Sequence, residues 1–171
     1  PRYTGMKLED FGQYIILTNF KSYVQNFAEI MNVEVQGKEA PMQSATKDNI
    51  TIINFSMGSA MAATIMDLLT AIMPKAVLFL GKTGVLKSYI GLGELILPIA
   101  AIRGEGTSND YFPPEVPALP AFNLEKAISS TIRDYERDYW TGTVYTTNRR
   151  VWEYDEEFKD YKVKKYENNF T

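Results

Sequence analysis

Three short polar segments that follow apolar runs carry the residue types that could do chemistry. They are 56–59 (Ser-Met-Gly-Ser), 81–84 (Gly-Lys-Thr-Gly) and 146–153 (Thr-Thr-Asn-Arg-Arg-Val-Trp-Glu). A fourth segment, 103–112, is the glycine-containing start of a long loop, and loops of that length are uncommon unless they are functional. Because ligands of open α/β sheets bind beyond the carboxyl ends of the strands, we expect these strand ends to converge on one crevice.

The first two segments suit a ligand that carries an anion and a flat ring. Backbone N–H groups at a helix that starts after Gly58 can hold an anion or a hydroxyl group. Gly81 and Gly84 let the backbone approach a ring closely, and Lys82 can meet a phosphate or a carboxylate. The spacing is not that of a P-loop. For both segments the alternative is a tight turn that needs only small residues.

The third segment places two cations beside a large aromatic ring. Arg149 and Arg150 suit a phosphate, because a guanidinium group can donate two parallel hydrogen bonds to it. Trp152 suits stacking on a base, since its ring is large and apolar with one polar edge. The alternative is a solvated turn that Trp152 covers.

The composition excludes several classes of chemistry. The chain contains no histidine and no cysteine, so a Ser-His-Asp triad, a thiolate nucleophile and a zinc finger are impossible within it. Acid–base chemistry must fall to Asp, Glu, Lys or Tyr. The net charge of −3 over 171 residues gives no general attraction to nucleic acid or to an anionic membrane. Any metal would have to be a hard ion held by oxygen. We assign no metal and no cofactor, and we expect no nucleic-acid partner.

The first half of the chain alternates expected strands with expected helices. The strands are 13–17, 49–55 and 76–80, the last a continuous apolar run that is typical of a buried parallel strand. Between them we expect a loop or weak hairpin over 33–48 and two helices. The first helix covers 20–31 and is capped by Asn19. The second covers 59–72, and Pro74 prevents it from continuing. Because this helix is apolar almost all round, we expect a sheet to cover one side of it and a subunit partner another.

The second half continues the alternation less regularly. We expect a strand over 94–102 that bends or bulges at Pro98, a loop over 103–121, a helix over 124–136 capped by Asn123, and a strand over 142–147. The last 41 residues show no further apolar strand and no closing helix. The pattern therefore predicts one α/β domain with three layers and a mixed, mostly parallel sheet, truncated at this end.

The apolar segments are short. The runs 76–81 and 95–102 fall well below the roughly 20 residues that a membrane-spanning helix needs. Residues 1–5 contain no apolar core of the kind a signal peptide has. We therefore expect a cytoplasmic protein without a membrane partner.

Taken in order, these segments resemble the nucleoside phosphorylase/nucleosidase superfamily, and within it the AMP nucleosidase family. The resemblance covers 1–158, and 159–171 form an atypical tail. It rests on the following segments: 1–5 (Pro-Arg-Tyr-Thr-Gly), 15–19 (Ile-Ile-Leu-Thr-Asn), 52–54 (Ile-Ile-Asn) before 57–59, 78–84, 113–117 (Pro-Pro-Glu-Val-Pro), and 141–147 with 152–153.

The resemblance implies a fold, an activity and an assembly. The fold is phosphorylase/hydrolase-like over a single domain, 1–171, and the assembly is a homo-oligomer, hexameric or dimer-based. The implied reaction is hydrolysis of the N-glycosidic bond of AMP to adenine and ribose 5-phosphate. On this basis we assign the site residues as follows: ribose, Gly58 and Ser59; base, Gly81, Thr83, Gly84 and Trp152; phosphate, Arg2, Lys82, Arg149 and Arg150.

Two departures from the family pattern bear on the activity. Phosphorylase relatives place an arginine near the position of Phe79, and its loss favours water over phosphate as the nucleophile. The family donates a proton from the Asp of a Ser-Asp pair and holds the sugar with the Glu of a Met-Glu pair. Neither pair occurs in this chain, so we assign no catalytic residue. The alternatives are a nucleotide-binding or assembly protein that lost its acid, and a purine nucleoside phosphorylase, against which Phe79 counts.

Overall fold

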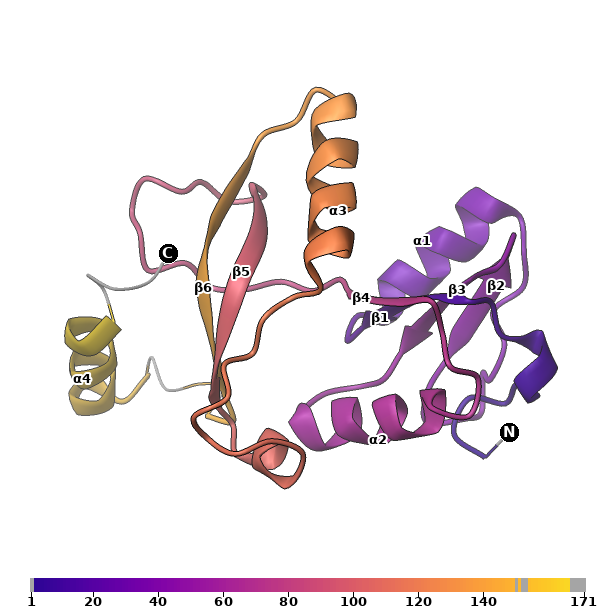
Figure 1. The fold of residues 1–171 in the computed structure, drawn as a ribbon, viewed down its shortest axis with the longest axis horizontal. Helices are drawn as coiled ribbons and strands as arrows, with labels where there is room; N and C mark the ends of the chain where they lie inside the picture. Colours follow the sequence, from indigo (N-terminus) through magenta and orange to yellow (C-terminus); the bar gives the residue numbers. More distant parts are fainter. Residues whose placement is uncertain (1, 150, 152–153, 167–171) are drawn as a thin grey trace. The chain divides into compact units, whose positions relative to one another are not determined.

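The chain divides into two compact units, Pro1–Lys82 and Thr83–Thr171. The computed structural model describes residues 2–149, 151 and 154–166 (Figure 1). Whether the chain acts as the single domain expected from its sequence stays a prediction, and we describe each unit by itself. The elements of the first unit are η1 (Leu8–Asp10), β1 (Tyr14–Thr18), α1 (Lys21–Met31), β2 (Ser44–Lys47), β3 (Ile50–Asn54), α2 (Ser59–Leu69) and β4 (Ala76–Phe79).

The first unit is built on a four-stranded sheet with the order β2-β3-β1-β4. β1 lies in the interior of this sheet and pairs in parallel with both β3 and β4. β2 pairs antiparallel with β3, which makes the sheet mixed but mostly parallel, as predicted. The register places Thr18 opposite Asn54 and Leu17 opposite Phe79, so the three parallel strands end at one edge of the sheet.

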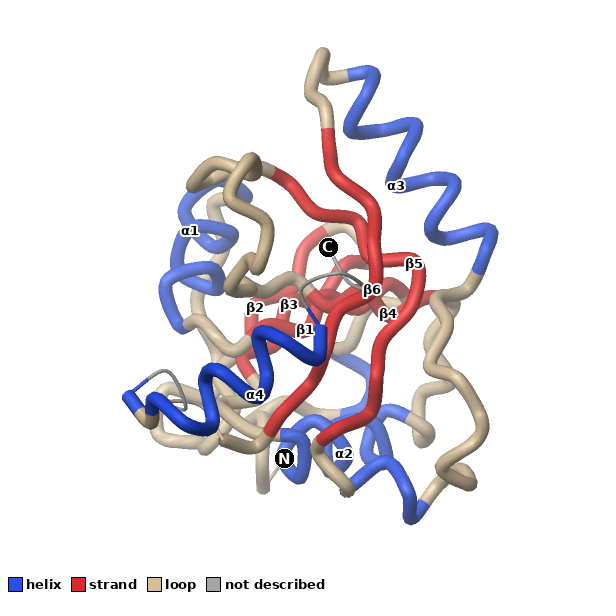
Figure 2. Tube along the Cα trace, turned by 90° about the vertical axis from the view of Figure 1, so that its left-hand side faces the viewer, coloured by secondary structure: helices blue, strands red, loops and turns tan. Residues whose placement is uncertain are grey.

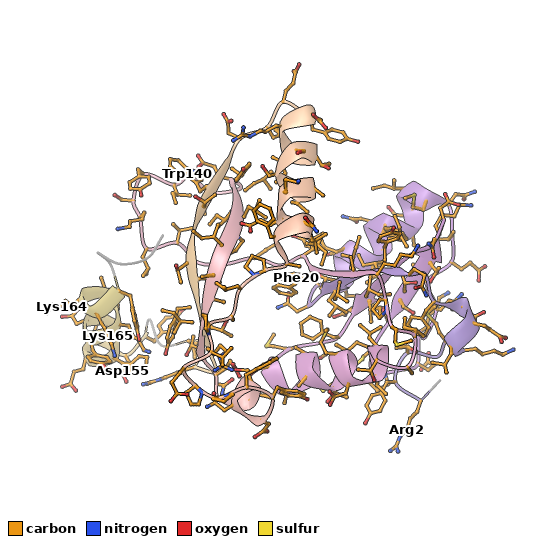
Figure 3. All side chains as sticks on the ribbon, viewed as in Figure 1. Arg2, Phe20, Trp140, Asp155, Lys164 and Lys165 are labelled. Atoms are coloured by element: carbon orange, nitrogen blue, oxygen red, sulfur yellow. The ribbon has the colours of Figure 1, made fainter. Side chains whose placement is uncertain are left out.

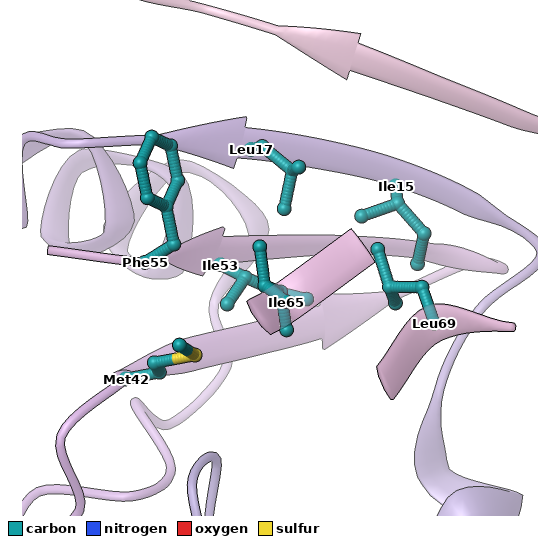
Figure 4. Packing of buried hydrophobic residues seen from close by; sticks show 7 residues of the cluster. All are labelled: Ile15, Leu17, Met42, Ile53, Phe55, Ile65 and Leu69. Atoms are coloured by element: carbon teal, nitrogen blue, oxygen red, sulfur yellow. The ribbon is translucent and has the colours of Figure 1, made fainter. Parts of the chain in front are cut away.

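One helix covers each face of this sheet, because successive strand residues point to opposite sides. Ile15, Leu17 and Ile53 pack with Ile65 and Leu69 of α2 in one buried cluster (Figure 4). Residues that point to the other face of the sheet form a second buried cluster with α1. Its members are Val24, Ala28, Ala45 and Ile52, and Ile16 packs against them. The unit therefore has the three α/β/α layers that the sequence predicted.

β4 is parallel as predicted, but the prediction that it is buried was wrong. It is the last strand of the sheet, with no further strand paired on its outer side among the described residues. Phe79 is 58% exposed and Leu80 is 44% exposed. A continuous apolar run is typical of a strand covered on both faces, but it does not reveal whether the strand lies in the middle of a sheet or at its edge.

The helix boundaries differ from the predicted ones because the predicted caps are not used. Phe20 is the N-cap of α1 and Ala121 that of α3, and neither helix has a side-chain cap hydrogen bond. Asn19 therefore does not cap α1, and Asn123 lies inside α3. α2 ends at Leu69, well before Pro74. The residues that follow form tighter turns, in which the Ile72 N–H donates to the Leu69 carbonyl at 3.1 Å.

The segment expected as a loop or weak hairpin contains a true strand. β2 and β3 are joined by Asp48 and Asn49, which both have positive φ angles of 47° and 69°. Two consecutive left-handed residues are the signature of a tight hairpin turn whose twist matches that of the strands. Asp and Asn tolerate this conformation better than most residues. Within 33–48 the weak-hairpin alternative is the better description, because Gln36 and Ser44 form an antiparallel bridge; the pairing of β2 with β3 was not predicted.

The second unit contains a long parallel pair of strands and two helices. Its elements are β5 (Leu95–Gly104), η2 (Thr107–Asp110), α3 (Phe122–Asp134), β6 (Tyr139–Thr147) and α4 (Glu156–Tyr166). β5 and β6 run side by side (Figure 2). The register shifts between Pro98 and Ala100, so Ile99 is the extra residue of a bulge and the predicted irregularity at Pro98 is confirmed.

The C-terminal segment forms a helix that the sequence pattern did not indicate, although none of its residues is buried. α4 is mostly polar and lacks a clear apolar period, so its pattern gave no helix signal. It is fastened to β6 by Lys162, whose Nζ donates to the Tyr145 hydroxyl at 2.6 Å and lies 4.1 Å from the centre of that ring. Gly104 makes room for this ring, since a β-carbon there would collide with Tyr145 and with the Thr146 carbonyl.

The described helices are all too short or too polar to cross a membrane.

The packing of the first unit predicts that two isoleucines contribute very differently to the free energy of unfolding. Ile53 is 0% exposed, whereas Ile30 is 79% exposed. Ile53→Ala should lower the free energy of unfolding by about 2–5 kcal/mol, because it removes buried contacts and leaves a cavity. Ile30→Ala, the matched control, should change it by less than about 0.5 kcal/mol. Urea unfolding measures both, and equal effects of the two substitutions would contradict this packing.

Candidate active site

The carboxyl edge of the sheet in the first unit brings three chain segments together. β1, β3 and β4 end there, and they are followed by 19–20, 55–59 and 80–82. Backbone hydrogen bonds join the ends: Phe55 N–H donates to the Thr18 carbonyl at 3.0 Å, and Leu80 N–H donates to the Leu17 carbonyl at 2.8 Å. Two of the predicted chemical segments, 56–59 and the first half of 81–84, thus start at the same edge.

The turn between β3 and α2 has an unusual backbone. Gly58 is the N-cap of α2 with φ 95° and ψ 152°, a conformation open almost solely to glycine. The Gly58 carbonyl accepts a hydrogen bond from the Ala62 N–H at 3.1 Å. This is the first hydrogen bond of the helix, so the N–H groups that come before Ala62 in its first turn have no acceptor within the helix. Ser59, which interacts with neighbouring groups, begins the helix. This geometry allows the ribose or anion contact predicted for Gly58 and Ser59.

Ser56, two residues before Gly58, is a residue that sequence reasoning did not single out. Its φ angle is +72°, and its N–H donates to the Asn54 side-chain oxygen at 2.9 Å. The side chain is exposed at the turn. A serine between apolar residues carries no signal of this conformation in its sequence.

Lys82 is held by aromatic rings rather than by an acid. Its Nζ lies 4.7 Å from the centre of the Phe20 ring and 5.8 Å from that of Tyr23; Phe20 is labelled in Figure 3. Among the described residues no carboxylate pairs with it. The cation is therefore placed at the ends of β1 and β4 with its charge uncompensated there, which suits the predicted phosphate contact. Gly81 lies against the Phe79 ring, where a β-carbon would collide with it.

Asn19 was predicted only as a cap, yet it belongs to this edge. Its Oδ1 is shielded from solvent and has no hydrogen-bond partner in the described part of the chain. A buried acceptor without a donor is costly, and it lies directly after Thr18 at the end of β1.

The structure separates Arg2 from the Gly58 turn. Arg2 lines a cavity of about 350 Å³ together with Leu68, Leu69 and Ile72 at the C-terminal end of α2, whereas Gly58 lies at the N-terminal end. Figure 3 shows Arg2 well apart from Phe20. Within one copy of the first unit, Arg2 and Lys82 are therefore not brought together as two contacts for one phosphate.

The second unit holds the remaining predicted residues. Thr83 donates its hydroxyl to the Gly84 carbonyl at 3.0 Å, and a β-carbon at Gly84 would meet nothing within 4 Å. The space beside Gly84 is open, and the base contact expected of Gly81, Thr83 and Gly84 stays a prediction. Arg150 and Trp152 lie outside the described residues, so their phosphate and stacking roles stay predictions.

The loop after β5 is tied down by its own charged residues. The Arg103 guanidinium donates to the carbonyls of Ser108 at 3.3 Å and Phe112 at 3.2 Å, and also to that of Pro113. Glu105 accepts from Ser108, and its carbonyl accepts from the Asn148 side chain at the end of β6. These contacts hold 103–113 in one conformation and join the loops that follow the two parallel strands.

Arg149 already has an anionic partner. Its Nη2 donates to Asp155 Oδ2 at 2.6 Å, and the guanidinium lies 4.3 Å from the centre of the Phe158 ring. Asp155, labelled in Figure 3, also accepts from Phe158 N–H at 3.0 Å at the start of α4. The Phe158 N–H, followed by Arg149, holds the pKa of Asp155 below its ordinary value. A phosphate at Arg149 must therefore compete with this carboxylate.

No group of three or more acidic side chains that could hold a metal ion occurs within residues 2–149, 151 and 154–166.

Comparison with known proteins identifies the family to which the chain belongs. Residues 13–168 match the family model described as the phosphorylase superfamily, so the chain belongs to that superfamily, as its sequence indicated. Within it, the chain is similar to AMP nucleosidases. The crystal structure of AMP nucleosidase from Bacteroides thetaiotaomicron VPI-5482 is 61% identical with a TM-score of 0.90, over 97% of this chain and 70% of that one.

More distant relatives extend the comparison. AMP nucleosidase of Escherichia coli K12 is 24% identical over 196 residues, which cover 88% of this chain and 40% of that protein. This chain thus spans well under half of that relative's length. The crystal structure of uridine phosphorylase from Vibrio fischeri ES114, 24% identical with a TM-score of 0.82 over 96% of this chain and 70% of that one, shares the fold.

The contacts of Asp155 predict how its pKa depends on Arg149. Arg149→Met should raise the pKa of Asp155 toward the ordinary value of 3.8. The rise should be incomplete, because the Phe158 N–H still stabilises the charged carboxylate. With its pKa lowered in the folded state, Asp155 stabilises α4 above pH 3.8 and loses that effect as the pH falls through the folded pKa. An NMR titration of the carboxyl carbon measures the shift, and an unchanged pKa would show that the ion pair is not formed in solution.

Proposed function

We propose that this chain takes part in hydrolysis of the N-glycosidic bond of AMP to adenine and ribose 5-phosphate. The observation that carries the proposal is the 61% identity with the Bacteroides thetaiotaomicron AMP nucleosidase over 97% of this chain. The phosphorylase relatives support glycosyl transfer in general, because they share the fold at lower identity.

In this proposal the edge of the first unit binds the sugar-phosphate part of AMP. Lys82 meets the 5′-phosphate, since its charge has no carboxylate partner among the described residues. The backbone at Gly58 and Ser59 faces the ribose. As the glycosidic bond breaks, positive charge develops on the sugar, and a water molecule attacks its anomeric carbon. By the resemblance, Phe79 lies near the position at which phosphorylases place an arginine, which supports water rather than phosphate as the nucleophile.

Two alternatives remain. The first is a nucleotide-binding or assembly protein that binds AMP and releases nothing. Phosphorylases among the relatives favour a purine nucleoside phosphorylase. A homo-oligomer is part of the main proposal, supported by exposed apolar side chains on and beside α2, namely Met57, Met66, Leu68 and Met73.

Adenine release separates these three functions. The chain is incubated with AMP in buffer without phosphate and then with it, and the products are separated by chromatography. We expect adenine and ribose 5-phosphate in both buffers. Release only with phosphate would replace the proposal with a phosphorylase. Binding of AMP without release in either buffer would replace it with the nucleotide-binding alternative.

The position of Lys82 predicts a phosphate-dependent loss of affinity. Lys82→Met should weaken AMP binding by about 1.5–3 kcal/mol, because a hydrogen bond to a charged group is lost. Adenosine, which lacks the phosphate, should bind the variant and the wild type equally. Lys38→Met in the loop before β2 is the control and should bind AMP normally. Isothermal titration measures these affinities, and an equal loss for adenosine would place Lys82 away from the phosphate.

A further inference from the structure

Ser56 adopts a costly backbone conformation that the fold itself does not use. Its φ angle is +72°, in the left-handed region where a side chain costs roughly 1–2 kcal/mol relative to glycine. Glycine would remove this cost. The exposed hydroxyl makes no hydrogen bond with the described residues, and only the backbone N–H of Ser56 is engaged, by Asn54. The side chain therefore adds strain to the fold without a contact that compensates for it.

The other non-glycine residues with positive φ have local explanations. Asp48 and Asn49 form the β2–β3 hairpin turn, and Asn32 ends α1 in the left-handed conformation. Met73 and Glu136 follow the ends of α2 and α3, where a left-handed residue commonly closes a helix. Among the described residues, Ser56 alone combines this conformation with a position at the carboxyl edge of the parallel strands.

A second polar group beside Ser56 is also left without a partner. Thr18 pairs with Asn54 in the sheet, so Asn19 follows β1 where Phe55 and Ser56 follow β3. The Asn19 Oδ1 is shielded and has no hydrogen-bond donor among the described residues. At the end of β4, Lys82 adds a cation that pairs with no carboxylate among the described residues. A strained residue, a shielded acceptor without a donor and this cation thus lie at three neighbouring strand ends. Strain and unsatisfied groups that cluster at one place are a reason to infer function there.

We infer that Ser56 is a specificity-determining residue whose hydroxyl binds an oxygen of the ribose 5-phosphate part of the substrate. The inference rests on the proposed function and deepens it. A hydroxyl group both donates and accepts, so it can bond a sugar hydroxyl or a phosphate oxygen. Ser56 lies two residues before the N-cap Gly58, on the edge that the proposed function gives to the sugar-phosphate. Its hydroxyl therefore contacts this half of the substrate and not the base, and that contact accounts for the strained backbone.

Two substitutions at Ser56 separate the hydroxyl from the strain. Ser56→Ala removes the hydroxyl and keeps the strain, whereas Ser56→Gly removes both. Glu136→Gly is the matched control, because Glu136 has a positive φ of 55° at the end of α3 and no assigned role. Both glycine variants should raise the melting temperature, by about 1–4 °C.

The test measures the binding of AMP, ribose 5-phosphate and adenine to the 171-residue chain by isothermal titration. We expect Ser56→Ala and Ser56→Gly to weaken binding of AMP and ribose 5-phosphate roughly tenfold, the effect of losing about one hydrogen bond, and to leave adenine binding unchanged. Glu136→Gly should bind all three ligands normally.

The failures are distinguishable. If the wild type binds AMP and ribose 5-phosphate and both Ser56 variants bind them equally well, the inference is overturned and the proposed function stands. An equal loss for adenine also overturns it, because the change then reaches beyond the sugar-phosphate. If the wild type binds neither AMP nor ribose 5-phosphate, the proposed function fails and the inference fails with it.

Discussion

The parallel pairing of β1 with both β3 and β4 is the constraint on which the first unit depends. Because β1 is paired along both edges, its alternate residues must be covered on both faces, and α1 and α2 supply that cover. The same pairing sets the ends of three strands level, with Thr18 opposite Asn54 and Leu17 opposite Phe79. A shift of one residue in this register would turn every apolar side chain of a strand to the opposite face, so packing and site geometry are fixed together.

Much of this architecture could be predicted from the sequence because it follows from short-range patterns. The expected strand at 49–55, the expected helix at 20–31 and the irregularity at Pro98 each correspond to a local structure that the chain adopts. The errors concern properties that depend on distant residues. The apolar run at 76–80 does not say which strand lies at the edge of the sheet, and the polar surface of α4 hides a helix that Lys162 and Tyr145 attach to β6.

The candidate site could likewise be predicted only in part. Lys82 and Gly58 could be proposed as site residues from their type, because a cation or a glycine directly after a strand has few explanations. Ser56 and Asn19 could not, since their interest lies in a dihedral angle and in a missing donor. Arg2 was grouped with Lys82 by charge alone, but its place at the far end of α2 depends on the path of the chain. Arg149 was assigned to a phosphate without regard to Asp155, six residues later, which bonds it.

The bulge in β5 has a consequence for the loop that follows it. The extra residue, Ile99, shifts the alternation of side chains along β5 by one position. The side chains of 100–104 therefore point to the opposite face of the strand from the one they would occupy without it. Arg103 lies within that stretch and donates to the carbonyls of the loop that ends at Pro113. A deletion of Ile99 would restore an even strand and invert the facing of Arg103. One irregular residue in the strand thus helps to set the conformation of a loop several residues away.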